Sequence, residues 1–424
     1  MKTLPTHSPR SSMLPDDFSA WSGGLADRGA PPVIGIAGSR GKSSVVHLLD
    51  AIVGFAGART AHWTDSGVTI GGRKQRGELL PWTRALGLLG AGELDVAIQE
   101  LDWDMVHAVG LPRGAYPVLA VINLCVNNDA CLLQDETLRA LRALRTIREA
   151  AHPDALFVLN ADDWAVAGGE LEGEGNQILV AQSRDTPLMR DHLARGGAAA
   201  WVENGDIRFG TEHAADALLP LAEIPITHDG AVGFLTTNVL TAVAVARGIG
   251  ISASTVANAL RLYHPDPLAL PGSFTTIDIG GALVIVDRPA PPWFLRAPLR
   301  AVARLTATRH VRIIGRASAI PDDELHETGR MLGRGGGLCV LHSEDDAPER
   351  TQLLRSGIAA NEVPPIVIHV ESEAAAIDSV LRALRPDDVV YMLADDPKTA
   401  VRRLQRAAER KAEADLDARL TAGT

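Results

Sequence analysis

The sequence predicts an α/β protein with two domains, each built on a mostly parallel sheet. Its 424 residues are too many for one compact core, because a domain typically takes about 150 residues. Short apolar runs alternate with amphipathic stretches along the chain, which is the pattern of strands that are joined by helices. A proline-rich stretch at residues 264–272 interrupts the alternation and predicts a boundary between the two domains.

The first domain begins with the apolar run at residues 33–37, which is followed by a glycine-rich turn and by apolar positions at helical spacing over 44–54. This order predicts a strand, a loop and a helix. The pattern predicts further buried strands at 95–98, 118–122 and 155–159, and an amphipathic helix at 136–151. Residues 237–262 read as two helices with a break at 248–252, where either Ser252 or Ser254 could cap the second helix.

The second domain has five apolar runs separated by helical segments, at 282–286, 311–314, 338–341, 366–370 and 389–393. They predict a smaller, Rossmann-like α/β domain, and residues 399–420 predict a charged amphipathic helix at its end. We therefore expect an N-terminal leader at 1–32, a central domain at 33–268 and a C-terminal domain at 269–424.

Composition excludes several classes of protein. The net charge of −11 argues against general affinity for nucleic acid, and no run of about 18 apolar residues indicates a membrane segment. Cys125, Cys131 and Cys339 lack the paired spacing of a zinc site, so we expect reduced core residues. The N-terminal residues contain no signal-peptide pattern, so the cytoplasm is the expected location.

The glycine-rich turn resembles a phosphate-binding loop. Gly35, Gly38 and Gly41 precede Lys42 and Ser43 in the pattern GxxGxxGKS, a variant of GxxxxGK[ST] in which Ile36 occupies the position of the first glycine. Glycines allow backbone N–H groups to point at phosphate oxygens, the lysine neutralises the β/γ charge and the hydroxyl binds Mg²⁺. The turn therefore predicts ATP and Mg²⁺ as cofactors and a central domain of the P-loop NTPase type. The residues expected to bind the nucleotide are Gly38, Ser39, Arg40, Gly41, Lys42, Ser43 and Ser44.

An acidic residue at the end of a neighbouring strand normally helps such a loop to hold Mg²⁺. Glu100 follows the apolar run at 95–98 and is the predicted metal partner of Ser43. The alternative is a solvated glutamate at a strand end. Asp102 and Asp104 lie close by and are expected at the surface.

Several segments in order resemble the Mur ligases and their relatives, which include cyanophycin synthetase, poly-γ-glutamate synthetase and folylpolyglutamate synthetase. The loop resembles their GTxGK[ST] signature, and six later segments resemble other family motifs: 95–100, 121–123, 157–163, 237–242, 270–272 and 284–287. The segment 66–72 is most similar to cyanophycin synthetase. About thirty residues precede the first strand, so we expect that the UDP-binding N-terminal domain of the peptidoglycan enzymes is lacking.

The resemblance implies an ATP-dependent acid–amino acid ligase that forms an amide through an acyl phosphate. Lys42 and Glu100 would be catalytic, Ser43 and Glu100 would hold Mg²⁺, and Asn238 and Asp287 would contact the nucleotide. The implied partners are small-molecule or peptide carboxylates and amines, with no nucleic acid or membrane. A homodimer, or a pairing with an active ligase homologue, is left open.

Positions where the family carries catalytic groups are changed in this sequence. Asn127 and Asn128 stand where an Asp-His pair is expected, and Leu144 stands where a lysine is expected. Ser273 replaces an arginine and Ala290 replaces a histidine. Three hypotheses follow: a divergent ligase; a catalytically degenerate ATP-binding homologue that acts as a regulatory or structural partner; or another phosphate-loop enzyme, such as a kinase or an ATP-driven switch.

Overall fold

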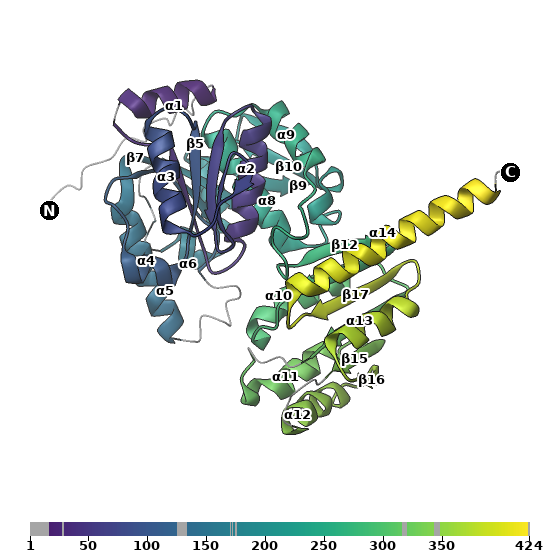
Figure 1. Ribbon diagram of the computed structural model, residues 1–424. Coiled ribbons are helices and arrows are strands. Elements are labelled where there is room, and N and C mark those ends of the chain that lie inside the picture. Colours follow the sequence, from purple (N-terminus) through teal and green to yellow (C-terminus); the bar gives the residue numbers. More distant parts are fainter. Residues whose placement is uncertain are drawn as a thin grey trace. The chain divides into compact units, whose positions relative to one another are not determined.

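The chain forms two compact units, Met1–His264 and Pro265–Thr424, which are described separately (Figure 1). The computed structural model describes residues 17–27, 29–124, 134–169, 171, 173, 176–315, 320–342 and 348–422. Most of the expected leader, together with Cys125, Asn127, Asn128 and Cys131, lies outside these residues.

In the described part of the first unit, eleven strands form one sheet in the order β11-β10-β9-β8-β7-β6-β1-β5-β2-β3-β4. The run from β9 to β2 is parallel, whereas the strands beyond it at both edges pair antiparallel. The strands are β1 (Val33–Ala37), β2 (Thr60–Thr64), β3 (Gly67–Ile70), β4 (Arg73–Lys74), β5 (Val96–Leu101), β6 (Tyr116–Val121), β7 (Ala151–Asn160), β8 (Asn176–Ala181), β9 (Ala198–Glu203), β10 (Asp206–Gly210) and β11 (Ala215–Pro220).

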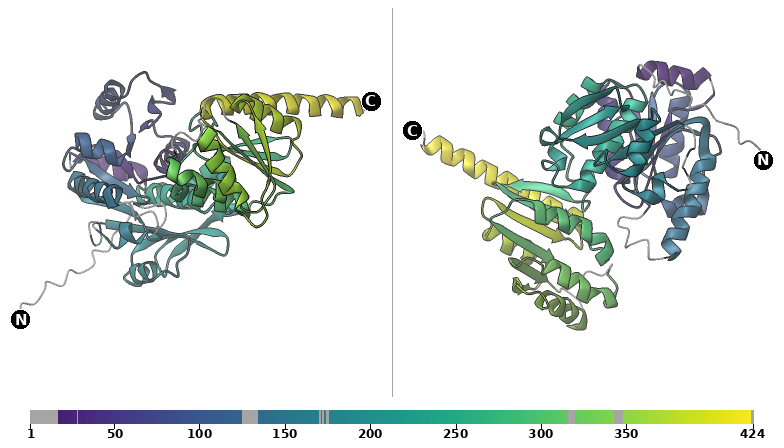
Figure 2. Two further views of the ribbon diagram at one scale, coloured as in Figure 1. Left: turned by 90° about the horizontal axis from the view of Figure 1, so that it is seen from below. Right: turned by 180° about the vertical axis from the view of Figure 1, so that it is seen from behind.

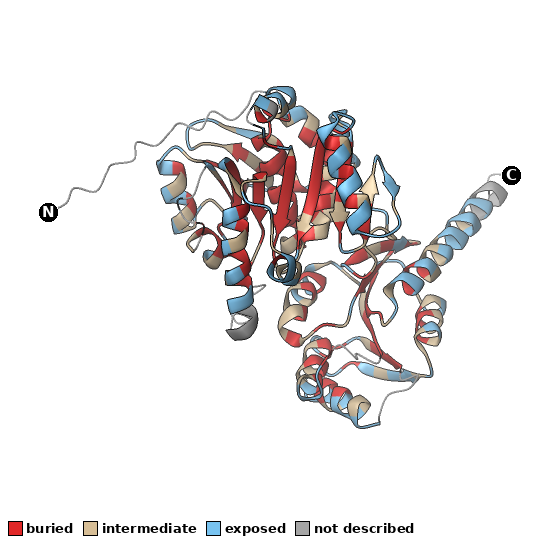
Figure 3. Cartoon of the chain, turned by 60° about the vertical axis from the view of Figure 1, so that its left-hand side comes forward, coloured by how far each residue is buried: buried red, intermediate tan, exposed pale blue. Residues whose placement is uncertain are grey.

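Helices cover both faces of this sheet and form a separate apolar core on each. One face carries α1 (Phe18–Asp27), α2 (Lys42–Phe55), α8 (Gly233–Gly248) and α9 (Ala253–Leu262). The other carries α3 (Leu79–Gly90), α4 (Trp103–Val109), α5 (Gln134–Ala150), α6 (Trp164–Ala167) and α7 (Pro187–Ala194). Two short 3₁₀ helices, η2 (Leu221–Glu223) and η3 (Pro225–Thr227), precede α8. Most residues of the central strands are accordingly coloured as buried in Figure 3.

Strand β1 illustrates why the sheet needs both layers. Ile34 and Ile36 pack into one core, while Val33 and Ala37 pack into the other, because successive side chains of a strand point to opposite faces. At Gly35 a Cβ atom would lie 2.7 Å from Cδ2 of Leu119 on β6. The neighbouring strand therefore fills the space that a side chain at this position would need.

The second unit contains a six-stranded sheet among its described residues, in the order β12-β13-β17-β14-β15-β16. Only β12 pairs antiparallel, with β13. The strands are β12 (Thr275–Ile279), β13 (Ala282–Asp287), β14 (Arg309–Ile314), β15 (Leu338–His342), β16 (Ile366–Val370) and β17 (Asp388–Leu393). The helices are α10 (Pro292–Arg304), α11 (Asp322–Leu332), α12 (Pro348–Ala359), α13 (Glu373–Arg382) and α14 (Pro397–Ala422), the last of which ends near the C-terminus (Figure 2).

The predicted α/β class is confirmed, and the strands and helices expected from periodicity are all present within a few residues. The sequence did not predict the parallel strands β2, β8 and β9, or the strands β3, β4, β10, β11 and β12, which pair only antiparallel. The antiparallel strands lie at sheet edges, where part of a face is left uncovered, so their apolar pattern is weaker. The proline-rich stretch lies where the two units meet along the chain, at His264 and Pro265.

The structure can be compared with two of the expectations from composition, the one for Cys339 and the one for membrane segments. Cys339 on β15 is a buried free thiol, and burial raises its pKa to about 12, so it is a core residue as expected. Among the described residues, no helix combines the length and apolar character that crossing a membrane requires.

The start of α9 gives a first testable prediction, because Ser252 and not Ser254 is its N-cap. The Ser252 hydroxyl accepts a hydrogen bond from the backbone N–H of Thr255 at 3.2 Å. We expect Ser252→Ala to lower the free energy of unfolding by about 1 kcal/mol, the usual cost of losing such a cap. Urea unfolding followed by tryptophan fluorescence measures this in the first unit, since of seven tryptophans only Trp293 lies in the second.

Ser254→Ala is the matched control, because it removes a hydroxyl from the same turn but leaves the N-cap in place. Its unfolding midpoint should stay close to that of the wild type. An equal loss of stability in both variants would contradict the assignment of Ser252 as the cap.

Candidate functional site

The loop between β1 and α2 bends at Gly41, directly before the helix begins. The φ angle of Gly41 is +84°, a left-handed conformation that strains residues with a side chain. A Cβ atom here would also lie 2.4 Å from Oδ1 of Asn238 on α8. Glycine is therefore required for two separate reasons, and the Asn238 side chain lies beside the predicted phosphate loop.

Asn123, two residues after β6, holds this loop in place. Its Oδ1 accepts hydrogen bonds from the backbone N–H groups of Ser39 at 2.9 Å and Arg40 at 3.0 Å. Its Nδ2 donates to the carbonyl oxygen of Arg40 at 3.1 Å. An asparagine is suited to this position because it offers an acceptor and a donor together, so the loop conformation depends on a residue more than eighty positions away in the sequence.

Asn160, the last residue of β7, and Asp163, three residues later, fix the segment that carries Asn123. Nδ2 of Asn160 donates to the carbonyl oxygen of Ile122 at 2.8 Å, and Oδ2 of Asp163 accepts from the backbone N–H of Leu124 at 2.8 Å. Asp163 is also the N-cap of α6. The motif at 157–163 therefore supports the loop through Asn123, a role that sequence reasoning missed although the motif itself was recognised.

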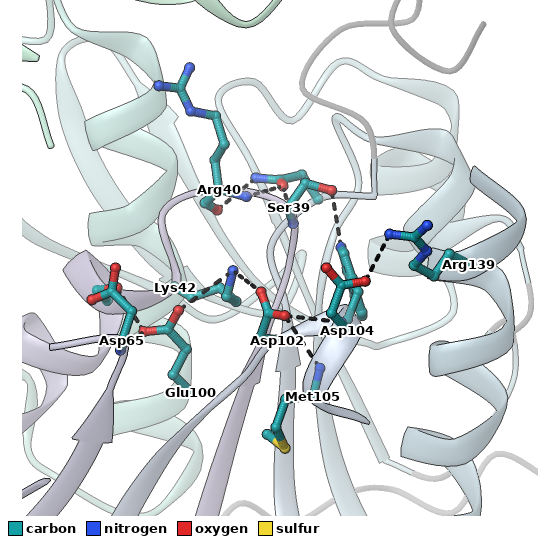
Figure 4. Close-up of polar contacts among 12 residues, drawn as sticks. Ser39, Arg40, Lys42, Asp65, Glu100, Asp102, Asp104, Met105 and Arg139 are labelled. Carbon is teal, nitrogen blue, oxygen red and sulfur yellow. Dashed lines mark hydrogen bonds and ion pairs between the residues drawn. The ribbon is translucent and has the colours of Figure 1, made fainter. Parts of the chain in front are cut away.

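Lys42, the first residue of α2, lies between two carboxylates (Figure 4). Its Nζ is 3.5 Å from Oε1 of Glu100 and 3.6 Å from Oδ2 of Asp102. The Lys42 and Glu100 side chains are 9% and 8% exposed, whereas that of Asp102 is 52% exposed. Asp102 is thus a surface residue, as expected, but it also contacts the lysine, which the sequence did not predict.

Glu100 connects the loop to the neighbouring strand. Its Oε2 accepts hydrogen bonds from the Ser43 hydroxyl at 2.7 Å and from the backbone N–H of Asp65 at 3.2 Å. Burial raises the pKa of Glu100, and the Lys42 charge and the Ser43 hydrogen bond offset part of this rise. A serine hydroxyl beside a carboxylate is a set of hard oxygen ligands, so these two residues fit the Mg²⁺ ion that the sequence predicts.

The other side of the loop is bounded by α4. Nε1 of Trp103 donates to the Ser39 hydroxyl at 3.1 Å, and that hydroxyl donates to the carbonyl oxygen of Leu124 at 2.6 Å. Asp102 caps α4 by accepting from the backbone N–H of Asp104. Trp103 had no predicted role because a tryptophan at a helix start carries no sequence signal for loop contact.

The structure brings most of the predicted site residues together. Gly38, Ser39, Gly41, Lys42, Ser43, Glu100 and Asn238 all lie at or against the loop. The Arg40 side chain points away from Lys42 and Glu100 in Figure 4, and Ser44 follows in the first turn of α2. Binding of a nucleotide by these residues stays a prediction.

Asp287 lies in the second unit, as the last residue of β13, and is buried. Its Oδ2 accepts from the Tyr391 hydroxyl at 3.1 Å and its Oδ1 accepts from the backbone N–H of Arg288 at 3.0 Å. These contacts orient the carboxylate inside its own sheet. Its predicted contact with the nucleotide stays a prediction.

The altered family positions differ in their surroundings. Leu144 is fully buried in the core beneath α5, and Ala290 is also buried, whereas Ser273 is exposed. Asn127 and Asn128 lie outside the described residues. The side chain of Leu144 thus belongs to the packing of the sheet.

Comparison with known proteins supports the resemblance. No family model matches the chain. Its sequence is 23% identical over 381 residues to the cyanophycin synthetase of Trichormus variabilis, a match that covers 88% of the chain and 42% of that protein. The chain therefore spans about two fifths of the length of the curated relatives it matches.

Solved structures have the same fold. The MurF ligase of Thermotoga maritima in complex with ADP matches with a TM-score of 0.57 at 15% identity, over 94% of this chain and 84% of that one. The chain therefore has the fold of the Mur ligases, and its sequence is similar to cyanophycin synthetase. The structure of E. coli FolC in complex with DHPP and ADP matches with a TM-score of 0.55 at 17% identity, over 96% of both chains.

The position of Lys42 leads to a second prediction, which concerns nucleotide affinity. We expect Lys42→Ala to weaken binding of ATP with Mg²⁺ roughly a hundredfold, because a hydrogen bond to a charged group contributes up to about 3 kcal/mol. Lys74→Ala is the matched control, since Lys74 on β4 is exposed. Calorimetric titration measures both, and unchanged affinity in the Lys42 variant would contradict its predicted role.

The raised pKa of Glu100 leads to a third prediction, on stability. Because the folded state holds the Glu100 proton more tightly than the unfolded state, protonation stabilises the fold, and this contribution is lost as the pH rises from about 4.5 through the raised pKa. In urea unfolding without nucleotide, the wild type should lose stability relative to Glu100→Gln over this range.

Glu93→Gln is the control for this pH series, because Glu93 is exposed and the variant retains Glu100. Its stability should follow that of the wild type at every pH. A constant difference between the wild type and Glu100→Gln would show that the burial of Glu100 has no effect on the titration.

Proposed function

We propose that this chain is an ATP-dependent carboxylate–amine ligase, which forms an amide bond through an acyl phosphate. The observation that carries the proposal is the shared carboxylate of Glu100, 2.7 Å from the Ser43 hydroxyl and 3.5 Å from Nζ of Lys42. A lysine, a hydroxyl and a carboxylate arranged around a glycine-rich loop are the groups that phosphoryl transfer uses to neutralise phosphate and to hold Mg²⁺.

The chain's own residues divide the work of binding. Asn123 accepts hydrogen bonds from the N–H groups of Ser39 and Arg40. The first N–H groups of a helix have no acceptor within the helix, so those at the start of α2 would bind the phosphate. Lys42 would neutralise the β/γ-phosphates, while Ser43 and Glu100 would hold Mg²⁺. When bound, ATP would supply the phosphoryl group that activates a substrate carboxylate toward an amine.

Two further nucleotide contacts belong to the proposal. The proposed contact of Asn238 is supported by its position, because a Cβ atom on Gly41 would lie only 2.4 Å from its Oδ1. Asp287 is supported by the family resemblance and by a carboxylate whose two oxygens are held by separate donors. Both residues would orient the nucleotide rather than take part in proton transfer.

For the substrates, we propose a small-molecule or peptide carboxylate and an amine of the amino-acid type. The likeness to cyanophycin synthetase over 88% of the chain supports this class. The likeness to the FolC structure, which holds ADP, supports the nucleotide. A cytoplasmic location is part of the same proposal, because ATP is its energy source.

A second candidate function is that of an ATP-binding partner of an active ligase, without amide synthesis of its own. The observation that favours it is Leu144, which is fully buried. A lysine at this position would bring a charge into an apolar core at a high cost, so the family's lysine has no equivalent on this helix face. Arg145 and Arg142, one and two positions away, are exposed and could bind an anionic substrate instead.

The fourth prediction separates the two candidates. A ligase should release ADP and phosphate only when both an acid and an amine are present, because the amine is needed to complete each turnover. We expect pools of amino acids and short peptides to stimulate ADP release, with mass spectrometry identifying the amide product.

Lys42→Ala should abolish this release, while Lys74→Ala should retain it. If the wild type binds ATP with Mg²⁺ but no combination of acid and amine stimulates ADP release, the ligase proposal fails and the binding partner is favoured. Absence of both binding and turnover would remove both candidates.

A further inference from the structure

A cluster of three side chains in the second unit has the composition of a metal site. His342 is the last residue of β15, Glu373 is the first residue of α13, and Asp395 lies two residues after β17. One ligand atom from each lies within 4.8 Å of the other two. The three residues are far apart in the sequence and belong to no motif that the proposed ligase function uses.

The cluster is built into the fold and is largely removed from solvent. The side chains of His342, Glu373 and Asp395 are 1%, 13% and 17% exposed. Oε2 of Glu373 accepts a hydrogen bond from the backbone N–H of Asp395 at 2.6 Å, which fixes the position of that carboxylate. Two carboxylates and a histidine held this close inside a protein concentrate negative charge, and a divalent cation would neutralise it.

The backbone leaves space for the imidazole ring of His342. Gly315 directly follows β14, and a Cβ atom at this position would lie 1.8 Å from Cε1 and 2.2 Å from Nε2 of His342. Any other residue at position 315 would displace the ring. The His342 ring therefore packs against the backbone just after β14, and this packing requires glycine at position 315.

The topology places the cluster where sheets of this kind bind ligands. From β14 the chain continues to β15 and β16 on one side, and then returns to β17 on the other side of β14. In open parallel sheets, ligands bind outside the carboxyl ends of the strands at the point where the strand order reverses. Gly315, His342 and Asp395 are at or just beyond the carboxyl ends of β14, β15 and β17.

The distances suit ligands of a shared ion better than direct hydrogen bonds. Nε2 of His342 is 3.9 Å from Oε2 of Glu373, and Nδ1 is 3.9 Å from Oδ2 of Asp395, which is too long for a hydrogen bond. Two ligands of a tetrahedral zinc ion, with bonds of about 2.0–2.1 Å, lie roughly 3.4 Å apart. Because one ion binds only one ring nitrogen, the carboxylate beside the other nitrogen would have to move toward the ion. One ligand atom from each residue already lies within 4.8 Å of the other two.

We propose that His342, Glu373 and Asp395 bind a divalent transition-metal ion of the zinc type. An imidazole nitrogen and carboxylate oxygens are both ligands that zinc accepts, whereas Mg²⁺ prefers oxygen ligands alone. Three protein ligands leave a further coordination position for water or for an anionic group. The site is separate from the proposed Mg²⁺ ligands Ser43 and Glu100, and it does not depend on the ligase function.

The fifth prediction tests this site by metal binding, without an activity assay. The full chain is treated with EDTA and titrated calorimetrically with Zn²⁺ in the absence of nucleotide. We expect His342→Gln and Glu373→Gln to lose one equivalent of zinc relative to the wild type, or to bind it more than roughly 100-fold more weakly, since loss of even an outer partner costs 10–100-fold. Zinc ions that bind elsewhere on the protein should bind equally to all variants, so they do not change the difference from the wild type.

His369→Gln is the matched control, because His369 is an exposed histidine on the adjacent strand β16. It should bind the same number of zinc ions as the wild type. Zinc should also raise the melting temperature of the wild type and of His369→Gln, but not that of His342→Gln. Co²⁺ added to the wild type should give the visible absorption of a low-coordinate site, a readout that needs no variant.

The proposal is overturned if His342→Gln, folded by circular dichroism, binds as much zinc as the wild type with equal affinity. It is also overturned if the wild type binds no zinc, which would leave the cluster as a histidine ion-paired with two carboxylates. Should the variants fail to fold, a wild type without Co²⁺ absorption would overturn it as well. None of these results bears on acceptor-dependent ADP release, so the two proposals fail independently.

Discussion

The carboxylate of Glu100 joins the predicted phosphate loop to the neighbouring strand. A buried carboxylate is costly unless it is paired and hydrogen-bonded, and Glu100 is contacted by the Lys42 ammonium, the Ser43 hydroxyl and the Asp65 backbone. These groups come from α2 and from the turn after β2. The contacts that compensate this one charge therefore hold the start of α2 next to the end of β5.

The parallel sheet makes this convergence possible. Strands β1, β5, β6 and β7 run in the same direction, so the polar residues that follow each of them gather at one edge. Asn123 follows β6 and Asp163 follows β7, and together they form a line of support that ends at Ser39 and Arg40. The same rule places Gly315, His342 and Asp395 together in the second unit.

Much of the fold could be predicted because a parallel strand that is buried on both faces reads as a continuous apolar run. This holds for residues 33–37 and 118–122, and for the runs of the second domain at 282–286, 311–314, 338–341 and 389–393. The run at 366–370 is an exception, because it forms the largely exposed edge strand β16. Among the strands that were missed, β10 alternates half-buried and buried positions and β11 is partly exposed, and the two pair antiparallel at an edge of the sheet. The burial of Leu144 could not be predicted in this way, because the position of a residue in a family motif does not reveal whether its side chain faces the core.

The sequence by itself determined the residues that are defined by local order: Gly41, Lys42 and Ser43 at a strand-to-helix turn, and Glu100 near the end of a strand. Local order suffices there because loop geometry and helix polarity depend on neighbours along the chain. Only the tertiary structure decided that Asn123 and Trp103 hold the loop, that Asp102 contacts Lys42, and that Asn238 lies against Gly41. These contacts join segments up to about 200 positions apart, and the packing of sheet and helices creates them.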